Sequence, residues 1–135
     1  MKEMVLKADV DNLYKVLDFI EQELESKNCA TKAKTQILVA VEEIFVNIAS
    51  YAYEGGDGEV KVQVSFIANL NVIVIIFIDN GVKYDPVAKK DPNTELTADE
   101  RPIGGLGIYM TKKFVDELIY DYKDGKNILT MKKRM

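Results

Sequence analysis

Histidine does not occur in this 135-residue sequence, and cysteine occurs once, at position 29. Without histidine, the chain can form neither a Ser-His-Asp triad nor a histidine-ligated metal site, and it cannot phosphorylate itself on histidine. A single cysteine excludes an intrachain disulfide and a cysteine-rich zinc site, so Cys29 is expected to be an inert loop thiol. No apolar run approaches membrane-spanning length, and the first residues lack a hydrophobic signal region. We therefore expect a cytoplasmic protein with no membrane partner.

The charge balance also excludes a class of partner. Eighteen basic and 22 acidic residues give a net charge of -4 and a pI near 4.9, whereas a nucleic-acid-binding domain favours a basic face. Hydrophobic residues make up 47% of the chain and charged residues 30%, which is ordinary for a globular protein. The acidic balance therefore predicts a protein that does not bind nucleic acid. The length suits one domain spanning residues 1–135.

Hydrophobic periodicity predicts an α+β fold. A first helix is expected from Asp9 or Asp11 to about Ser26, and a second from a Thr31 cap to about Tyr53. The remaining expected elements are an edge strand at 3–7, strands at 59–66 and 72–78, a loop at 81–103, a helix at 106–115, and a hairpin of strands 117–122 and 127–132. The prediction is a two-layer α/β sandwich, with a mixed sheet covered on one face by three helices.

The second helix carries a polar pair, Glu43 and Asn47, one turn apart. Taken alone, the pair is explained more simply by a solvated helix face, but asparagine is a mediocre helix former and is an unusual choice for an exposed site. A carboxamide oxygen suits magnesium, which prefers hard oxygen ligands and retains water. A carboxylate one turn away could accept a proton from an attacking hydroxyl. Glu42 is the competing carboxylate, but it lies off the line of Asn47.

Asp79 ends the most apolar strand and is followed by Asn80 and Gly81. A carboxylate beside a hydrophobic floor could accept the exocyclic amine of adenine, while the glycine lets the ring approach the backbone. The same three residues are also an ordinary turn signature, so this motif alone leaves both interpretations open.

A glycine-rich turn opens the third helix, where Gly104, Gly105 and Gly107 surround Leu106. Backbone N–H groups there could bind phosphate at the helix N-terminus. The turn is neither a Walker A loop nor a dinucleotide-binding fingerprint, and it is weak evidence alone. Arg101, just upstream, either contacts phosphate or is a solvated residue of the long loop.

Taken together, these motifs resemble the GHKL ATPase superfamily, which has the Bergerat nucleotide-binding fold. The likeness is greatest to the small anti-sigma-factor serine kinases and covers nearly the whole chain. Its most specific segments are Val41–Asn47 with Tyr51–Tyr53, Asp79–Gly81 with Tyr84–Pro86, and Gly104–Ile108 with Val115–Glu117.

This resemblance implies a role for each matched position. Glu43 would be the catalytic base, and Asn47 would hold Mg2+. Asp79 would bind the adenine amine of ATP beside Gly81. The phosphate-covering lid would include Gly105 and Gly107, in the stretch from Gly104 that contains Leu106. The implied partners are an anti-anti-sigma-like regulator, which is phosphorylated on serine, and a sigma factor, with the kinase forming a homodimer.

Two departures from the family pattern stand out. Tyr51 occupies the position where some relatives carry histidine. Lys126 and Asn127 follow the hairpin glycine, where some relatives have threonine.

Together, the motifs and the resemblance predict an ATP-dependent serine/threonine protein kinase. The alternative is a nucleotide-gated protein-interaction module without significant kinase activity, and phosphate on a partner's serine separates the two.

Overall fold

The computed structural model describes residues 1–54, 56–88 and 105–135. The described helices are α1 (Leu13–Ser26), α2 (Thr31–Tyr51) and α3 (Gly105–Phe114), with short 3-10 helices η1 (Val10–Asn12) and η2 (Ala68–Leu70). The strands are β1 (Lys2–Lys7), β2 (Glu59–Ile67), β3 (Val72–Asp79), β4 (Glu117–Lys123) and β5 (Lys126–Arg134). Within these ranges, no helix combines the length and the apolarity needed to cross a membrane.

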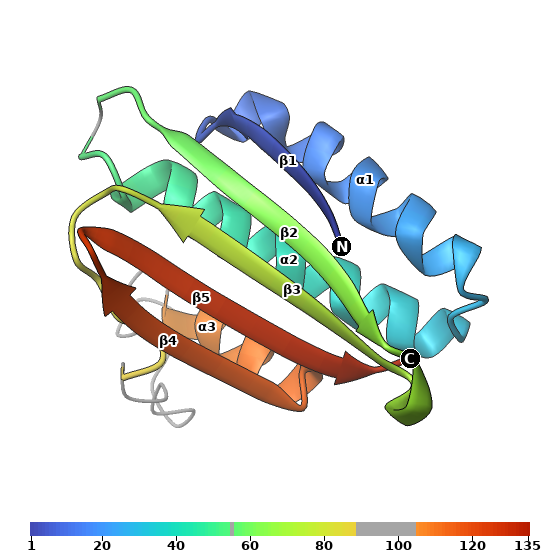
Figure 1. The fold of residues 1–135 in the computed structure, drawn as a ribbon. Coiled ribbons are helices and arrows are strands. Elements are labelled where there is room, and N and C mark those ends of the chain that lie inside the picture. Colours follow the sequence, from blue (N-terminus) through green and yellow to red (C-terminus); the bar gives the residue numbers. More distant parts are fainter. Residues whose placement is uncertain (55, 89–104) are drawn as a thin grey trace.

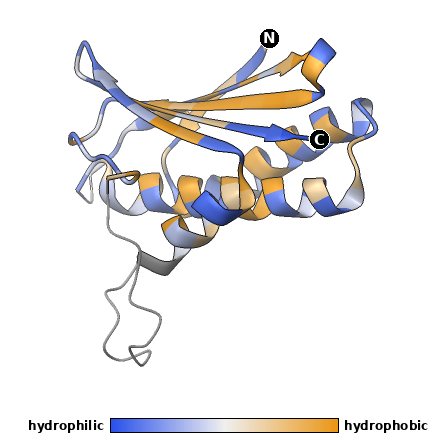
Figure 2. Ribbon diagram, turned by 90° about the horizontal axis from the view of Figure 1, so that it is seen from below, coloured by the Kyte–Doolittle hydropathy of each residue, from blue (hydrophilic) through white to orange (hydrophobic). Residues whose placement is uncertain are grey.

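The five strands form one sheet in the order β1-β2-β3-β5-β4, and the helices pack on one of its faces (Figures 1 and 2). This confirms the α+β prediction and the two layers. The expected mixed sheet is wrong in detail, because all four described pairings are antiparallel. The chain crosses from β3 through α3 to β4, but β5 lies between those two strands, so no parallel neighbours arise.

The core lies between the sheet and the helices. Its largest fully buried side chains include Phe45 and Ile44 from α2, and Phe77 and Ile75 from β3. The burial of Ile44 and Phe45 gives α2 the apolar face that helical periodicity predicts. Strand β3 is apolar along nearly its whole length, although the helices cover one face of the sheet only (Figure 2). Its other face carries Val74, Ile76 and Ile78, which alternate with the core residues.

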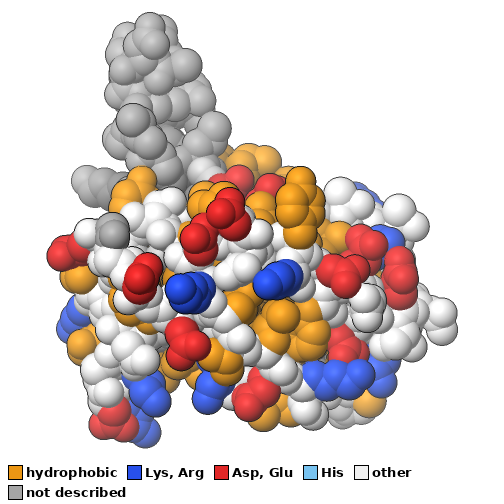
Figure 3. Space-filling view, turned by 90° about the horizontal axis from the view of Figure 1, so that it is seen from above, with side chains coloured by type: hydrophobic (Ala, Val, Ile, Leu, Met, Phe, Trp, Pro, Cys, Tyr) orange, Lys and Arg blue, Asp and Glu red, His pale blue; other side chains and the backbone are white. Residues whose placement is uncertain are grey.

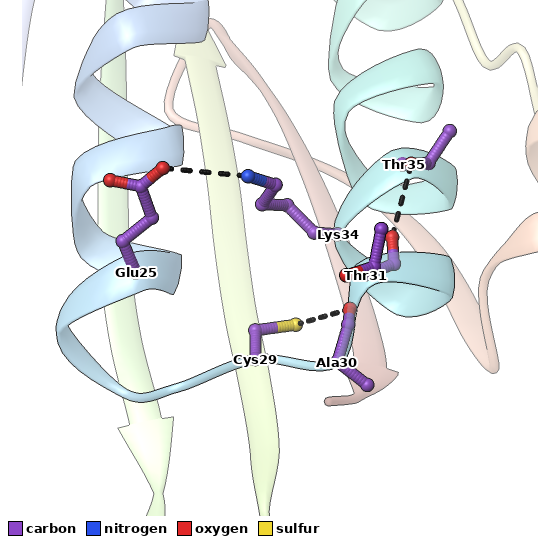
Figure 4. Close-up of polar contacts among 6 residues, drawn as sticks. All are labelled: Glu25, Cys29, Ala30, Thr31, Lys34 and Thr35. Atoms are coloured by element: carbon purple, nitrogen blue, oxygen red, sulfur yellow. Dashed lines mark hydrogen bonds and ion pairs between the residues drawn. The ribbon is translucent and has the colours of Figure 1, made fainter.

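The helix starts differ from the expectation. Residue Ala30 occupies the N-cap position of α2 without a side-chain bond, whereas Thr31 is the first helical residue. The carbonyl of Thr31 accepts the hydroxyl of Thr35 at 3.0 Å, as Figure 4 shows. Propensity placed Thr31 at the cap, but the extended backbone that a cap requires falls one residue earlier. The side chain of Asp9 does accept a backbone bond, from Asp11 N at 2.9 Å, although it caps η1 rather than α1.

The connection between α1 and α2 contains Cys29 (Figure 4). Its thiol is half-buried and donates to the carbonyl of Ala30 at 3.5 Å, and burial raises its pKa. Nearby, Nζ of Lys34 in α2 forms an ion pair with Oε1 of Glu25 in α1, at 3.4 Å. A protonated, partly covered thiol agrees with the inert role expected from the sequence.

Two hairpin turns connect neighbouring strands, and the one between β4 and β5 confirms the predicted hairpin. After β2, η2 ends at Asn71 in the left-handed conformation, with φ 55°. Between β4 and β5, both Asp124 (φ 54°) and Gly125 (φ 76°) have positive φ, as a tight two-residue hairpin of type I′ requires. The long segment expected at 81–103 is described only as far as Ala88.

Candidate nucleotide-binding site

A pocket opens between α2, the end of β3, α3 and the β4–β5 hairpin. Its walls are mostly apolar side chains, and the polar groups are few. The lining residues are Ile44, Asn47, Ile48, Tyr51, Ala52, Asp79, Val82, Tyr84, Pro86, Ile108, Tyr120, Asn127 and Leu129. Asn47 and Asp79, which lie 32 residues apart in sequence, therefore meet across one cavity. Concave, mainly apolar sites with a few convergent polar groups are typical of small-molecule binding.

Asp79 lies at the end of β3 and is only 5% exposed. Its Oδ1 accepts the backbone N–H of Gly81 at 2.8 Å, so the three residues do form the turn that their sequence indicates. A Cβ at Gly81 would overlap the carbonyl oxygen of Ala52 and lie 2.7 Å from its Cβ. The next residue, Val82, donates its N–H to that carbonyl at 2.7 Å. The turn signature and a pocket-lining carboxylate thus coexist here, because glycine lets the turn close against the end of α2.

Tyr53 ties the same turn to β2. Its hydroxyl donates to the carbonyl of Glu59 at 2.5 Å and accepts the N–H of Asn80 at 3.0 Å. A Cβ at Gly58 would overlap the Tyr53 ring, so glycine is needed there for close approach. Burial raises the pKa of Tyr53, which keeps the phenol protonated and able to donate. The base of the pocket is therefore fixed from α2, β2 and β3 together.

Asn127 was not singled out as a site residue by the sequence, yet it lies at the centre of the polar part of the pocket. It is 7% exposed and stands opposite Asp79 in the β3–β5 pairing. Its Nδ2 donates to Oδ1 of Asp79 at 2.9 Å and to the carbonyl of Val82 at 2.9 Å, with a longer contact of 3.4 Å to the carbonyl of Gly81. One side chain thus holds the carboxylate and the backbone that follows it.

The carbonyl end of Asn127 is equally engaged. Its Oδ1 accepts the hydroxyl of Tyr120 at 2.5 Å and the backbone N–H of Tyr84 at 3.2 Å. Burial raises the pKa of Tyr120, so that its hydroxyl stays protonated and serves as a donor. The sequence carries one signal for this role of Asn127, namely the departure from threonine near this position. The contact with Asp79 depends on the β3–β5 pairing, which joins residues far apart in the sequence.

Glu43 and Asn47 project from α2 one turn apart, but they differ in their surroundings. Asn47 lines the pocket, whereas Glu43 lies outside the lining, against the start of α3. A Cβ at Gly107 would overlap Oε2 of Glu43 and lie 3.0 Å from its Cδ. Glu43 is half-buried, whereas Glu42 is exposed. The structure thus brings two of the motifs named above into contact, Glu43 with the glycine-rich helix start.

The other residues of that glycine-rich turn are only partly described. Arg101 and Gly104 lie outside the described residues. Gly105 begins α3 and Leu106 follows it in the helix. Of this stretch, the observed contribution to the site is that of Gly107 and the neighbouring Ile108, which lines the pocket.

The donor set at the pocket suits magnesium better than a transition metal. Among the described residues, no three histidine, cysteine, aspartate or glutamate side chains cluster closely enough to hold a metal ion. The carboxamide of Asn47 offers one hard oxygen at the pocket wall. Magnesium commonly takes one or two protein oxygens and completes its octahedron with water and substrate phosphates. The residues present therefore fit an ion that arrives with a phosphate-bearing ligand.

The buried carboxylate of Asp79, the carboxamide of Asn47 and Ile108 of α3 line one mainly apolar pocket, which is typical of a small-molecule site. Comparison with known proteins agrees: the family described as histidine kinase-like ATPase domain matches residues 6–133. The chain belongs to this family. The result confirms the resemblance to the GHKL ATPases and supports ATP as the ligand.

Individual relatives are protein kinases by name. The chain is 31% identical over 99 residues to the serine-protein kinase RsbW of Bacillus pumilus, which covers 70% of this chain and 61% of that protein. It is 24% identical over 102 residues to the serine/threonine-protein kinase BtrW of Bordetella bronchiseptica, covering 76% of this chain and 71% of that one. The RsbW of Listeria monocytogenes is 24% identical over 106 residues, covering 75% and 66%. The matches thus span less than two thirds of the length of these two RsbW proteins.

Proposed function

We propose that the protein is an ATP-dependent serine/threonine protein kinase of the anti-sigma-factor type, which phosphorylates a small anti-anti-sigma partner. The observation that carries the proposal is the placement of Glu43 and Asn47 on one face of α2. Asn47 lines the pocket, and Glu43 lies one turn away against Gly107. Names of relatives at 31% and 24% identity support the same activity.

The chemistry follows from this placement. Adenine would lie over the apolar wall with its amine toward Asp79, and the phosphates would extend along α2 toward the start of α3. Asn47 would hold magnesium, which when bound neutralises charge on the phosphates. Glu43 would accept the proton of the partner's serine hydroxyl as its oxygen bonds the γ-phosphorus. The bond from that phosphorus to the β–γ bridging oxygen breaks, and ADP leaves.

The first test is ligand-dependent stability. A ligand at about 100 times its dissociation constant stabilises the native state by about 2.7 kcal/mol. With unfolding entropy of about 2.1 cal/mol/K per residue, 135 residues give roughly 3.5 °C per kcal/mol, hence a rise of about 9 °C in Tm. We expect that rise with magnesium and ATP for the wild type, and a much smaller one for Asn47→Ala. Ser50→Ala, exposed on the same helix, is the control. Absence of any shift in the wild type would refute nucleotide binding.

The second test separates the kinase from a nucleotide-gated interaction module. Glu43→Ala should retain ATP binding but lose phosphoryl transfer to serine of an anti-anti-sigma protein, measured by mass spectrometry. Glu42→Ala is the matched control, because its carboxylate is adjacent and exposed. A general base contributes roughly 10²- to 10⁴-fold to the rate. Transfer that persists in Glu43→Ala would contradict the assignment, and wild-type binding without transfer would favour the module.

We also propose that the kinase forms a homodimer and binds a sigma factor. The sheet face opposite the helices supports the dimer, since Ile119 is 48% exposed there and Val74, Ile76, Ile78 and Ile128 share this face. Two such faces could pack as a sandwich. Sedimentation of the wild type and of Ile119→Asp tests the dimer. Acidic and basic side chains are interspersed on the molecular face shown in Figure 3, which suits a protein partner.

A further inference from the structure

Asn127 has no hydrogen-bonding group left for a ligand. Its two N–H groups go to Asp79 and Val82, at 2.9 Å each. Its carbonyl oxygen accepts from Tyr120 at 2.5 Å and from Tyr84 at 3.2 Å, which uses both lone pairs. Any hydrogen bond between this side chain and a bound base would break an existing one. The effect of Asn127 on a ligand must therefore pass through the groups that it holds.

The most consequential of these groups is the carboxylate of Asp79. Its Oδ1 already accepts two bonds, from Gly81 N at 2.8 Å and from Asn127 Nδ2 at 2.9 Å. Within residues 1–54, 56–88 and 105–135, every hydrogen bond to this carboxylate reaches Oδ1. Oδ2 is therefore the acceptor available to a ligand, on a side chain that is 5% exposed and lines the pocket.

The number of free acceptor oxygens decides which purine fits. Adenine presents one exocyclic amine beside a ring acceptor, whereas guanine presents an amine and a ring N–H as adjacent donors, which pair with both oxygens of a carboxylate. We propose that Asn127 is a positioning and specificity-determining residue. It occupies Oδ1 of Asp79 and leaves Oδ2 as the single acceptor for one amine, which selects adenine over guanine. The inference rests on the proposed nucleotide-binding function and goes beyond it.

Tyr120 completes the arrangement from the neighbouring strand. Its hydroxyl donates to Asn127, which fixes the amide with its N–H groups toward Asp79 rather than its carbonyl. A flipped amide would place two acceptor oxygens against each other in a buried site, which is costly. The pair Tyr120–Asn127 therefore determines which oxygen of Asp79 is occupied before any ligand arrives.

The experiment measures dissociation constants by calorimetry for ATP, GTP and purine riboside triphosphate, which lacks the amine. The variants are Asn127→Ala, Tyr120→Phe and Asp79→Asn, with Tyr122→Phe as the control on the same strand. The wild type should bind ATP roughly tenfold or more tightly than either analogue. Asn127→Ala should bring the ATP-to-GTP ratio toward one, Tyr120→Phe should lower it partway, and Tyr122→Phe should leave it unchanged. In the Asp79→Asn background, Asn127→Ala should change the ratio no further.

The outcomes distinguish the inference from the function beneath it. If the wild type binds no nucleotide, the proposed function fails and the inference fails with it. If the wild type prefers ATP and a folded Asn127→Ala protein keeps the full preference, the nucleotide site stands and the role of Asn127 is refuted. If Asn127→Ala does not fold, Tyr120→Phe decides: a ratio equal to that of the wild type overturns the inference, and a reduced ratio supports it.

Discussion

Replacement of Gly107 by alanine tests the contact between α3 and Glu43 without any ligand or partner. The new Cβ would overlap Oε2 of Glu43 and lie 3.0 Å from its Cδ, so the carboxylate must move. The carboxylate is the mobile end of a half-buried side chain, so its displacement should cost only the lower end of the overpacking range, about 1 kcal/mol. Alanine also favours a helix over glycine by about 0.5–1 kcal/mol. The two effects nearly cancel, so the expected net destabilisation is about 0–0.5 kcal/mol, or at most about 2 °C in Tm at roughly 3.5 °C per kcal/mol.

The same substitution should change sign when the obstructing side chain is absent. In a Glu43→Ala background the new methyl group meets no carboxylate, and only the gain in helix propensity remains, about 0.5–1 kcal/mol. Urea unfolding of the wild type, the two single variants and the double variant gives the interaction energy, which should be about 1 kcal/mol. A Glu42→Ala background is the control and should show no such coupling, because that side chain is exposed.

Equal effects of Gly107→Ala in the wild-type and Glu43→Ala proteins, within about 0.5 kcal/mol, would refute the contact. The carboxylate would then lie elsewhere, and its proposed place beside the transferred phosphoryl group would lose its structural support. Because this cycle uses folding alone, it remains informative whatever the partner is.

Two further predictions concern the base of the pocket. Gly81→Ala should destabilise the protein by about 2–4 kcal/mol in a urea titration, because overpacking adds to the loss of the 2.7 Å hydrogen bond from Val82 to Ala52. Gly125→Ala is the comparison variant in the hairpin turn. Its Cβ would meet nothing within 4 Å, so only the positive φ of 76° opposes it, at a cost of about 1–2 kcal/mol. Burial raises the pKa values of Tyr53 and Tyr120 above the ordinary 10.0, so the folded state retains protons that the unfolded chain releases. The contribution of these two groups to stability should therefore be constant below pH 10 and should be lost as the pH rises through their folded pKa values. Phe substitutions at both positions should flatten that alkaline decline in stability. An unchanged slope would contradict the burial of the phenols.

The sequence predicted the elements whose signal is local. Apolar spacing located α1 and α2, and alternation located β2 and the β4–β5 hairpin, because burial on one face imposes the period. The tight turn at Asp124 and Gly125 followed from the same short-range chemistry. The start of α2 was misplaced by one residue, since a threonine can serve either as a cap or as the first helical residue.

What could not be predicted depends on pairing between distant strands. The position of β5 between β3 and β4 brings Asn127 opposite Asp79, 48 residues away. Neither residue's immediate neighbours contain that information. The family motifs identified the carboxylate, but its partner on β5 and the Tyr120 hydroxyl became visible only when the sheet order was known.

The β3–β5 pairing also ties ligand binding to the dynamics of the hairpin. Separation of β5 from β3 would remove the Asn127 bonds to Asp79 and Val82 together, so the pocket exists only while this part of the sheet is closed. A bound nucleotide should therefore slow amide hydrogen exchange along β5 and its hairpin partner β4, far beyond the atoms that it touches. Exchange at β1, on the opposite edge of the sheet, would change less. The two edges of the sheet would therefore differ in how strongly a ligand protects them against local opening.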